Sequence, residues 1–192
     1  VNLAPEAEED SWEILQAEML ACQQCDLCQS RQQVVTGAGN QHADFLWVTE
    51  APGFEDEQQG KPFADHSGEL LTEMLRAMLL RREDVFITHI VKCRPPDDRD
   101  PKVPELAACE HFLQRQISLI QPKVIIALGR ISAQKLLQSK APLAELRETE
   151  HEFSGIPLQT IYHPAYLLRS LTEKAKAWQD MQRALALYEK VK

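Results

Sequence analysis

The sequence has no apolar run near the roughly 20 residues that a membrane-spanning helix needs. It also has no visible signal peptide, internal repeat or low-complexity segment. These absences argue against membrane and repeat proteins, and we expect a soluble, cytoplasmic bacterial protein. Because the chain opens on Val1 instead of Met, we expect residues upstream of it to be missing.

Basic residues are in the minority, with 21 Lys and Arg against 29 Asp and Glu and a formal net charge of -8. Most nucleic-acid-binding proteins present a basic face, so this balance lowers the expectation of such a partner. It does not exclude a local basic stripe, because clustered charges act within a Debye length of about 8–10 Å.

The length of 192 residues, 44% of them hydrophobic, suits one domain with a proper core. We expect a flexible acidic stretch over residues 1–10 and a single domain over residues 11–192. Short apolar runs alternate with helical periodicity, which predicts an α/β fold, a three-layer α/β/α sandwich with a mostly parallel central sheet. The predicted strands are residues 45–49, 85–91, 124–129 and 158–162. The predicted helices are one capped by Ser11 and those over residues 67–79, 104–117, 131–137 and 173–191, while residues 36–40, 55–61 and 92–101 are predicted loops.

The run from Phe45 to Gly53 ends abruptly at Glu50, Pro52 and Gly53. A buried parallel strand ends in this way when its last residues line a pocket at the carboxyl edge of the sheet. We expect Phe63 and His163 to complete that pocket. Taken singly, Phe63 is equally typical of a core aromatic residue, and His163 of a polar cap at a strand end.

Five cysteines in a chain without secretory features indicate a metal or redox role more than a disulfide framework. They are Cys22, Cys25, Cys28, Cys93 and Cys109. Four thiolates from two distant parts of a chain can bind a 4Fe-4S cluster or, as the runner-up, a tetrahedral zinc ion. We expect such a site to tie the N-terminal helix to the 92–101 loop. The spacing leaves open a Cys25 and Cys28 pairing, and the alternative is a set of ordinary buried thiols.

Seven segments carry a family resemblance. They are Cys22-x-x-Cys25-x-Leu27 with Arg31, Gly37-x-Gly39-Asn40, Glu50-Ala51-Pro52-Gly53, Gly60-x-Pro62-Phe63, Lys92-Cys93-Arg94-Pro95-Pro96, Cys109, and His163-Pro164-Ala165-Tyr166-Leu167-Leu168-Arg169. In these segments, in this order, the chain resembles the family 4 uracil-DNA glycosylases, the iron-sulfur branch of the uracil-DNA glycosylase superfamily. The resemblance implies hydrolysis of the N-glycosidic bond of uracil, or of a related deaminated base, in DNA.

The resemblance also implies roles for individual residues. Glu50 and His163 are the implied catalytic residues. The implied base-binding residues are Ala51, Pro52, Gly53, Phe63 and His89, and the implied DNA-binding residues are Arg94, Arg99, Tyr166, Leu167, Leu168 and Arg169. The implied ligands of a 4Fe-4S cluster are Cys22, Cys25, Cys93 and Cys109. The expected partner is DNA with a damaged base, near the bacterial nucleoid, for a monomer or a member of a hetero-complex with replication or repair proteins.

The chain departs from the family pattern where activity is decided. Thr49 replaces a glycine, and His89 replaces an asparagine that reads the base. Residues 64–68 and the Asp97-Asp98 pair also differ. These departures and the acidic balance keep a second hypothesis open: a catalytically silent member of the fold that acts as a binding subunit in DNA replication or repair. The psi subunit of the bacterial DNA polymerase III clamp loader is similar in this respect.

Overall fold

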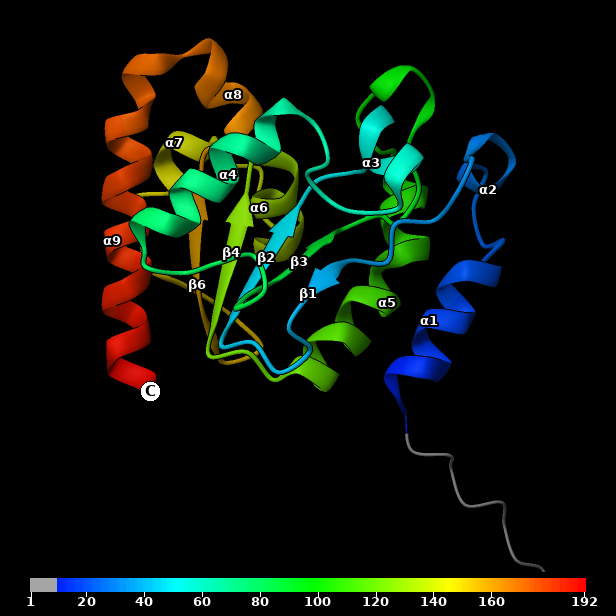
Figure 1. The fold of residues 1–192 in the computed structure, drawn as a ribbon, viewed down its shortest axis with the longest axis horizontal. Coiled ribbons are helices and arrows are strands. Elements are labelled where there is room, and N and C mark those ends of the chain that lie inside the picture. The colour runs from blue at the N-terminus through cyan, green and yellow to red at the C-terminus, as the bar shows by residue number, and fades with distance from the viewer. Residues whose placement is uncertain (1–9) are drawn as a thin grey trace, which may run out of the picture.

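The computed structural model describes residues 10–192, and its centre is a six-stranded sheet (Figure 1). The strands are β1 (Ala38–Gly39), β2 (Phe45–Thr49), β3 (Phe86–His89), β4 (Val124–Leu128), β5 (His151–Phe153) and β6 (Ile156–Ile161). They lie in the order β1-β3-β2-β4-β6-β5. The inner four are parallel, and the short edge strands β1 and β5 are antiparallel to their neighbours.

Helices cover both faces of the sheet (Figure 1). They are α1 (Trp12–Ala21), α2 (Leu27–Ser30), α3 (Phe54–Gln59), α4 (His66–Ala77), α5 (Val103–Ile120), α6 (Arg130–Leu137), α7 (Leu143–Leu146), α8 (Pro164–Arg169) and α9 (Lys174–Val191), with short 3-10 turns at η1 (Pro96–Asp98) and η2 (Leu171–Glu173). Successive strand residues alternate between two apolar cores. Trp47 and Ile126 pack with α4 and α9, whereas Leu46 and Ile125 pack with α5 and α6. The predicted mostly parallel sandwich is therefore confirmed.

The N-terminal helix α1 lies beside α5, at the far end of the molecule from α9 (Figure 1). Ser11 caps α1, as predicted, by accepting a hydrogen bond from the backbone of Ile14. Leu15 and Met19 bury the inner face of the helix in a third apolar cluster. Arg115 of α5 adds ion pairs to the start and the outer face of α1. Cys22, which follows α1 directly, is therefore held close to α5.

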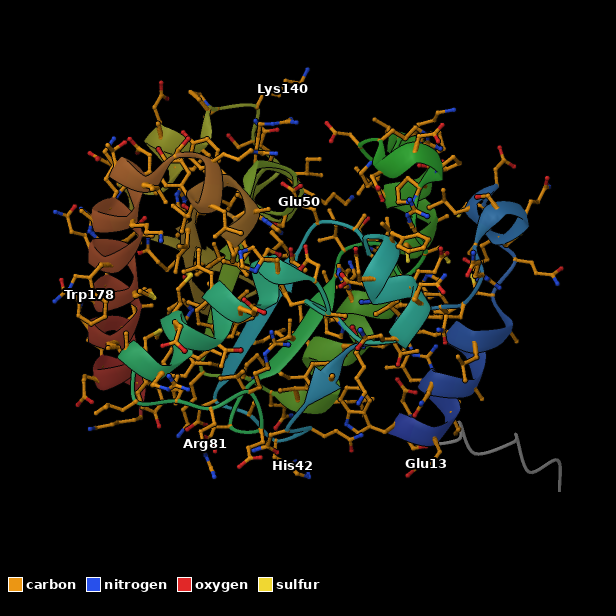
Figure 2. The ribbon with its side chains drawn as sticks, turned by 45° about the horizontal axis from the view of Figure 1, so that its top comes forward. Glu13, His42, Glu50, Arg81, Lys140 and Trp178 are labelled. Atoms are coloured by element: carbon orange, nitrogen blue, oxygen red, sulfur yellow. The ribbon has the colours of Figure 1, made fainter. Side chains whose placement is uncertain are left out.

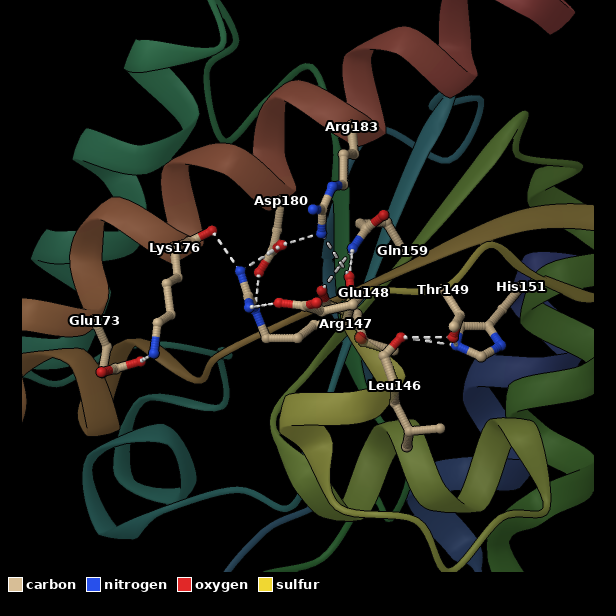
Figure 3. A network of polar contacts seen from close by, with 11 residues as sticks. Leu146, Arg147, Glu148, Thr149, His151, Gln159, Glu173, Lys176, Asp180 and Arg183 are labelled. Atoms are coloured by element: carbon tan, nitrogen blue, oxygen red, sulfur yellow. Dashed lines mark hydrogen bonds and ion pairs between the residues drawn. The ribbon is translucent and has the colours of Figure 1, made fainter.

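A buried ion pair attaches the C-terminal helix to the connection between α7 and β5 (Figure 3). Arg147 donates two hydrogen bonds to Asp180, of 2.8 and 3.0 Å, and both side chains are almost completely buried. Arg183 and Gln159 close the network by bonding the backbone carbonyl of Arg147. Removing one partner of such a pair typically costs about 3–5 kcal/mol.

Two predicted loops are wrong in part. Residues 55–61, predicted as a polar loop, contain α3. Its three acidic residues lie in the first turn, where the helix dipole favours negative charge, and Gly60 ends it with a left-handed φ of 67°. Residues 36–40 contain the edge strand β1. The sequence reasoning also missed α7 and β5, which are only four and three residues long.

Among residues 10–192, no helix is both long enough and apolar enough to cross a membrane. The expected acidic stretch over residues 1–10 falls outside the described residues except for Asp10, which pairs with Arg115. The division into that stretch and one domain over residues 11–192 stays a prediction.

Candidate active site

The site lies at the carboxyl ends of β2, β4 and β6, where the chain topology changes direction. The chain leaves β2 toward β3 on one side, and it leaves β4 toward β6 on the other. Open α/β sheets bind ligands in the crevice at such a switch point. Figure 2 shows Glu50 at this end of the molecule.

Glu50 follows β2 directly and reaches across to the start of α6. Its Oε1 accepts a hydrogen bond of 3.0 Å from the backbone N–H of Ile131. Burial raises the pKa of Glu50, and the backbone hydrogen bond opposes this only in part. The carboxylate is therefore held in place beside a helix start and partly shielded from water.

Gly129 makes the approach of Glu50 possible. Its φ of +87° favours glycine, and a Cβ there would lie 2.5 Å from Oε1 of Glu50 and 3.3 Å from Cβ of His163. The two implied catalytic residues thus flank one glycine. The sequence reasoning treated Gly129 only as the end of a strand, although a glycine directly after an apolar strand is a usable signal of close approach.

His163 is fixed in one tautomer by its own backbone. It is the N-cap of α8, and its Nδ1 accepts a hydrogen bond of 3.1 Å from the N–H of Ala165. Nδ1 therefore has no proton, and the neutral ring carries its proton on Nε2. Nε2 lies 3.1 Å from the Thr49 hydroxyl. Burial lowers the pKa of His163 to about 4, so the ring is a neutral hydrogen-bond donor near pH 7.

Phe63 stacks on His163, with ring centroids 5.3 Å apart. Its backbone has a φ of 53°, a left-handed conformation that is strained for an aromatic residue and is typical of functional sites. Arg82 accommodates this loop by donating to the carbonyl of Phe63 at 3.1 Å. Gly68 is needed there as well, because a Cβ on it would lie 2.0 Å from the same carbonyl oxygen.

His89 ends β3 beside Thr49, its register partner on β2. Its Nε2 lies 3.3 Å from Oδ2 of Asp56, and Oδ1 of the same carboxylate accepts a hydrogen bond of 2.8 Å from the backbone of Ala64. Burial alone would raise the pKa of Asp56, but the hydrogen bonds from His89 and the backbone bring it below its ordinary value. Burial lowers the pKa of His89, and its Nδ1 has no hydrogen-bond partner among the described residues. The sequence reasoning missed Asp56 because it placed this residue in a loop.

A groove of about 660 Å³ opens beside these residues. Its walls include Glu50, Ala51, Pro52, Gly53 and His163, as the implied roles require. Phe63 lines a neighbouring hollow instead, and His89 is buried behind Asp56. The structure thus brings Glu50 and His163, the implied catalytic residues, to the groove, while the ring of Phe63 packs on His163.

The implied DNA-binding residues are not equally available. Tyr166 and Arg169 are exposed and line the groove. Leu167, by contrast, is 1% exposed and packs in the core, so its expected contact with DNA is not possible in this conformation. Arg94 is paired with Asp98, and Arg99 with a glutamate of α5.

All five cysteines line one apolar cavity between α1, α2 and α5. All are free thiols, and two of their sulfurs accept hydrogen bonds. Arg31 donates to Sγ of Cys93 at 3.2 Å, and the backbone of Lys92 donates to Sγ of Cys109 at 3.3 Å. Burial raises the pKa of the Cys93 thiol to about 11, whereas Arg31 favours its thiolate. Hydrogen-bond donors beside the sulfur atoms stabilise thiolates, which are the form of cysteine that binds a metal cluster.

The sheet topology is that of an α/β protein with a ligand site at the carboxyl edge of its sheet. Glu50 and His163 lie at the switch point of that edge. A model of the uracil DNA glycosylase superfamily matches residues 36–182, and the chain belongs to this superfamily. It is 40% identical over 159 residues to a type-4 uracil-DNA glycosylase of Archaeoglobus fulgidus, covering 79% of this chain and 80% of that protein. It is 37% identical over 186 residues to a type-4 uracil-DNA glycosylase of Thermotoga maritima, covering 95% and 97%.

Proposed function

We propose that this protein is a DNA repair hydrolase that cleaves the N-glycosidic bond of uracil, or of a related deaminated base, in DNA. The relatives named above are glycosylases of this kind. The observation that carries the proposal is the position of Glu50 and His163 on two sides of Gly129, at the wall of one groove.

In this hydrolysis a water adds to C1′ of the sugar as the glycosidic C–N bond breaks, and the base leaves with the bonding electron pair and is then protonated. Cleavage leaves cationic character on the sugar and anionic character on the departing base. Glu50 is a carboxylate that stabilises the first, and the Nε2–H of His163 is a donor that stabilises the second. Because its pKa is about 4, His163 acts by hydrogen bonding as a neutral ring. Thr49 accepts that hydrogen bond in the free protein and is displaced by the base carbonyl.

Base binding requires the target nucleotide to leave the DNA stack, because its glycosidic bond is unreachable inside a duplex. The ring of Phe63 supplies a stacking surface beside His163. His89 donates to Asp56 through Nε2, and its Nδ1 is an acceptor without a partner among the described residues. Nδ1 is buried, so it reaches a base N–H, such as that of uracil or a deaminated purine, only after the residues around it move.

The cysteine cavity supports a 4Fe-4S cluster on Cys22, Cys25, Cys93 and Cys109. The same thiolates could instead hold a tetrahedral zinc ion, which is the runner-up, and iron and zinc analysis of the purified protein distinguishes the two. When bound, the cluster would crosslink the end of α1 and the α1–α2 connection to the 92–101 loop and α5, and Cys28 is the spare thiol.

Base release from oligonucleotides tests the proposal. The purified protein is incubated with single-stranded and duplex substrates that contain uracil, hypoxanthine or xanthine, and abasic sites are cleaved with alkali. We expect release of uracil by the unaltered chain and almost none by Glu50→Gln. No release of any base by protein whose iron content and absorption spectrum show an intact cluster would contradict the proposal.

A second function, a silent binding subunit, is favoured by the ion pairs of the groove. Arg99 pairs with Glu105, and Arg130 pairs with Asp100, so carboxylates occupy positions where phosphates would bind. Pull-down from bacterial cells distinguishes the two functions. Stoichiometric recovery of replication proteins, together with no base release, supports the subunit.

A further inference from the structure

Phe54 is an exposed aromatic residue at the wall of the groove. It is the first residue of α3, directly after Gly53, and 48% of its surface is exposed. It belongs to none of the three apolar clusters of the described residues. A large apolar ring that adds nothing to the core but lies beside a candidate active site is typical of a binding surface.

Arg94 packs on the ring of Phe54, and together the two side chains form a platform. Its guanidinium carbon lies 5.2 Å from the centre of the Phe54 ring. Asp98 holds the guanidinium through two hydrogen bonds of 2.7 and 3.1 Å, and Glu57 approaches it from the protein side at 3.6 Å. The guanidinium is therefore fixed beside the ring, and about half of the ring stays open to solvent. An aromatic ring backed by arginine is the arrangement on which unpaired nucleobases stack.

The charges of the groove favour a single strand over a duplex. The groove walls carry the acidic residues Glu55, Asp98 and Asp100. Of the arginines in these walls, Arg99 is engaged by Glu105 and Arg130 by Asp100, and Arg169 faces the groove. A duplex brings about one phosphate charge for every 1.7 Å of its axis, which these carboxylates oppose. A flexible single strand can place a base on the ring while its phosphates turn toward solvent. Stacking, and not phosphate contact, then carries the affinity.

We propose that Phe54, backed by Arg94, binds the unpaired nucleobase next to the extruded one, so that the groove accepts single-stranded DNA. This inference rests on the proposed function and deepens it by naming the form of the substrate. It involves no covalent step. The site is distinct from the ring of Phe63, which is 5% exposed and packs on His163.

The test is a binding measurement on the full-length protein. The probe is a single-stranded oligonucleotide with one cleavage-resistant uracil nucleotide and a fluorescent adenine analogue beside it. We expect the unaltered protein to quench the analogue by stacking. Phe54→Ala should raise the Kd roughly 5-fold to 100-fold and abolish the quenching, while Phe54→Trp should retain both.

Trp178 provides the matched control. It is a similarly exposed aromatic residue, 39% exposed, on α9 at the edge of the molecule, away from Glu50 (Figure 2), and it does not line the groove. Trp178→Ala should leave the Kd and the quenching unchanged. Circular dichroism and Tm of each variant confirm that the fold is intact.

Four outcomes decide the proposal. Unchanged Kd and quenching in Phe54→Ala overturn it, even if the protein releases uracil normally. Equal loss of affinity for single-stranded and duplex probes overturns the single-strand assignment. If the protein releases no base but Phe54→Ala still loses the quenching and the affinity, the proposed function fails and the nucleobase site stands. A weak effect on duplex binding with a strong effect on the single strand supports the proposal in full.

Discussion

The cysteine cavity and the active-site groove meet at one short segment of chain. The two differ in the kind of side chains that line them and in how those side chains are paired. Cys93 lines the cavity, and its neighbour Arg94 holds the platform at the groove. In the cavity, thiols gather within apolar walls and receive hydrogen bonds from Arg31 and the backbone of Lys92. At the groove, polar side chains are hydrogen-bonded to one another. An example is the contact between Thr49 and His163.

This difference separates two tasks. The cavity lies between distant parts of the chain, and the proposed cluster would crosslink them. The groove is organised without a ligand, because Glu50 and His163, the residues proposed to be catalytic, are already hydrogen-bonded to Ile131 and Thr49. Variants in the cavity should therefore act on stability, and variants in the groove on chemistry.

The largest effect is expected in the cavity. Cys93→Ser should lower the free energy of unfolding by roughly 4 kcal/mol or more, because the loss of a metal site removes a crosslink of the folded state. The measurements are denaturant unfolding, iron content and the visible absorption of the cluster. Cys28→Ser is the matched control and should change none of them. If Cys28→Ser loses the cluster and Cys22→Ser keeps it, the ligand set includes Cys28.

The next largest effect is expected on catalysis. Glu50→Gln should lower kcat by about 100-fold to 1,000-fold with little change in stability, since it removes the charge that faces the developing sugar cation. Burial raises the pKa of Glu50 above its ordinary 4.5, so the active carboxylate is lost as pH falls through that raised pKa. His163, with a pKa of about 4, stays neutral over that range.

The pH profile checks this assignment. The acid limb of kcat should have its midpoint above 4.5 in the unaltered protein and should vanish in Glu50→Gln. A limb that persists in the variant would assign it to another group.

The sheet and the main helices could be predicted because their signals are local. The buried run Val124–Leu128 and the periodic helix from His66 to Ala77 are found where apolar patterning places them. The helix α3 was not predicted, because none of its residues apart from Phe54 is apolar and its stability comes from charge at its first turn and a glycine at its end. Patterning also cannot reveal that such a helix places Asp56 under His89.

The site was predicted as a set of residue types but not as a set of contacts. The sequence indicated that Glu50 and His163 face one pocket, and both do line the groove. It could not indicate that Gly129 lies between them, since that closeness depends on the register of β2 and β4. Nor could it show that Leu167 of the implied DNA-binding segment turns into the core.

A smaller effect is expected from Thr49, the partner of His163 in the free protein. Thr49→Val keeps the shape but leaves the Nε2–H of His163 without an acceptor, which should cost about 1–3 kcal/mol of stability. A base carbonyl supplies that acceptor, so we expect KM to fall severalfold while kcat changes little. Thr49→Ser should behave like the unaltered protein. A lower kcat in Thr49→Val would instead mean that the hydroxyl positions the ring in the transition state.

The smallest effect is expected at the loop that the cavity and the groove share. Asp97 and Asp98 both have left-handed backbone conformations, with φ of 54° and 52°. Asp97→Gly should raise the free energy of unfolding by about 0.5–1 kcal/mol, because glycine adopts this conformation without steric cost. Asp97→Ala removes the same charge but keeps the strain, so it separates the two causes. Equal stabilisation by both variants would mean that the lost negative charge, and not the relieved backbone strain, causes the effect.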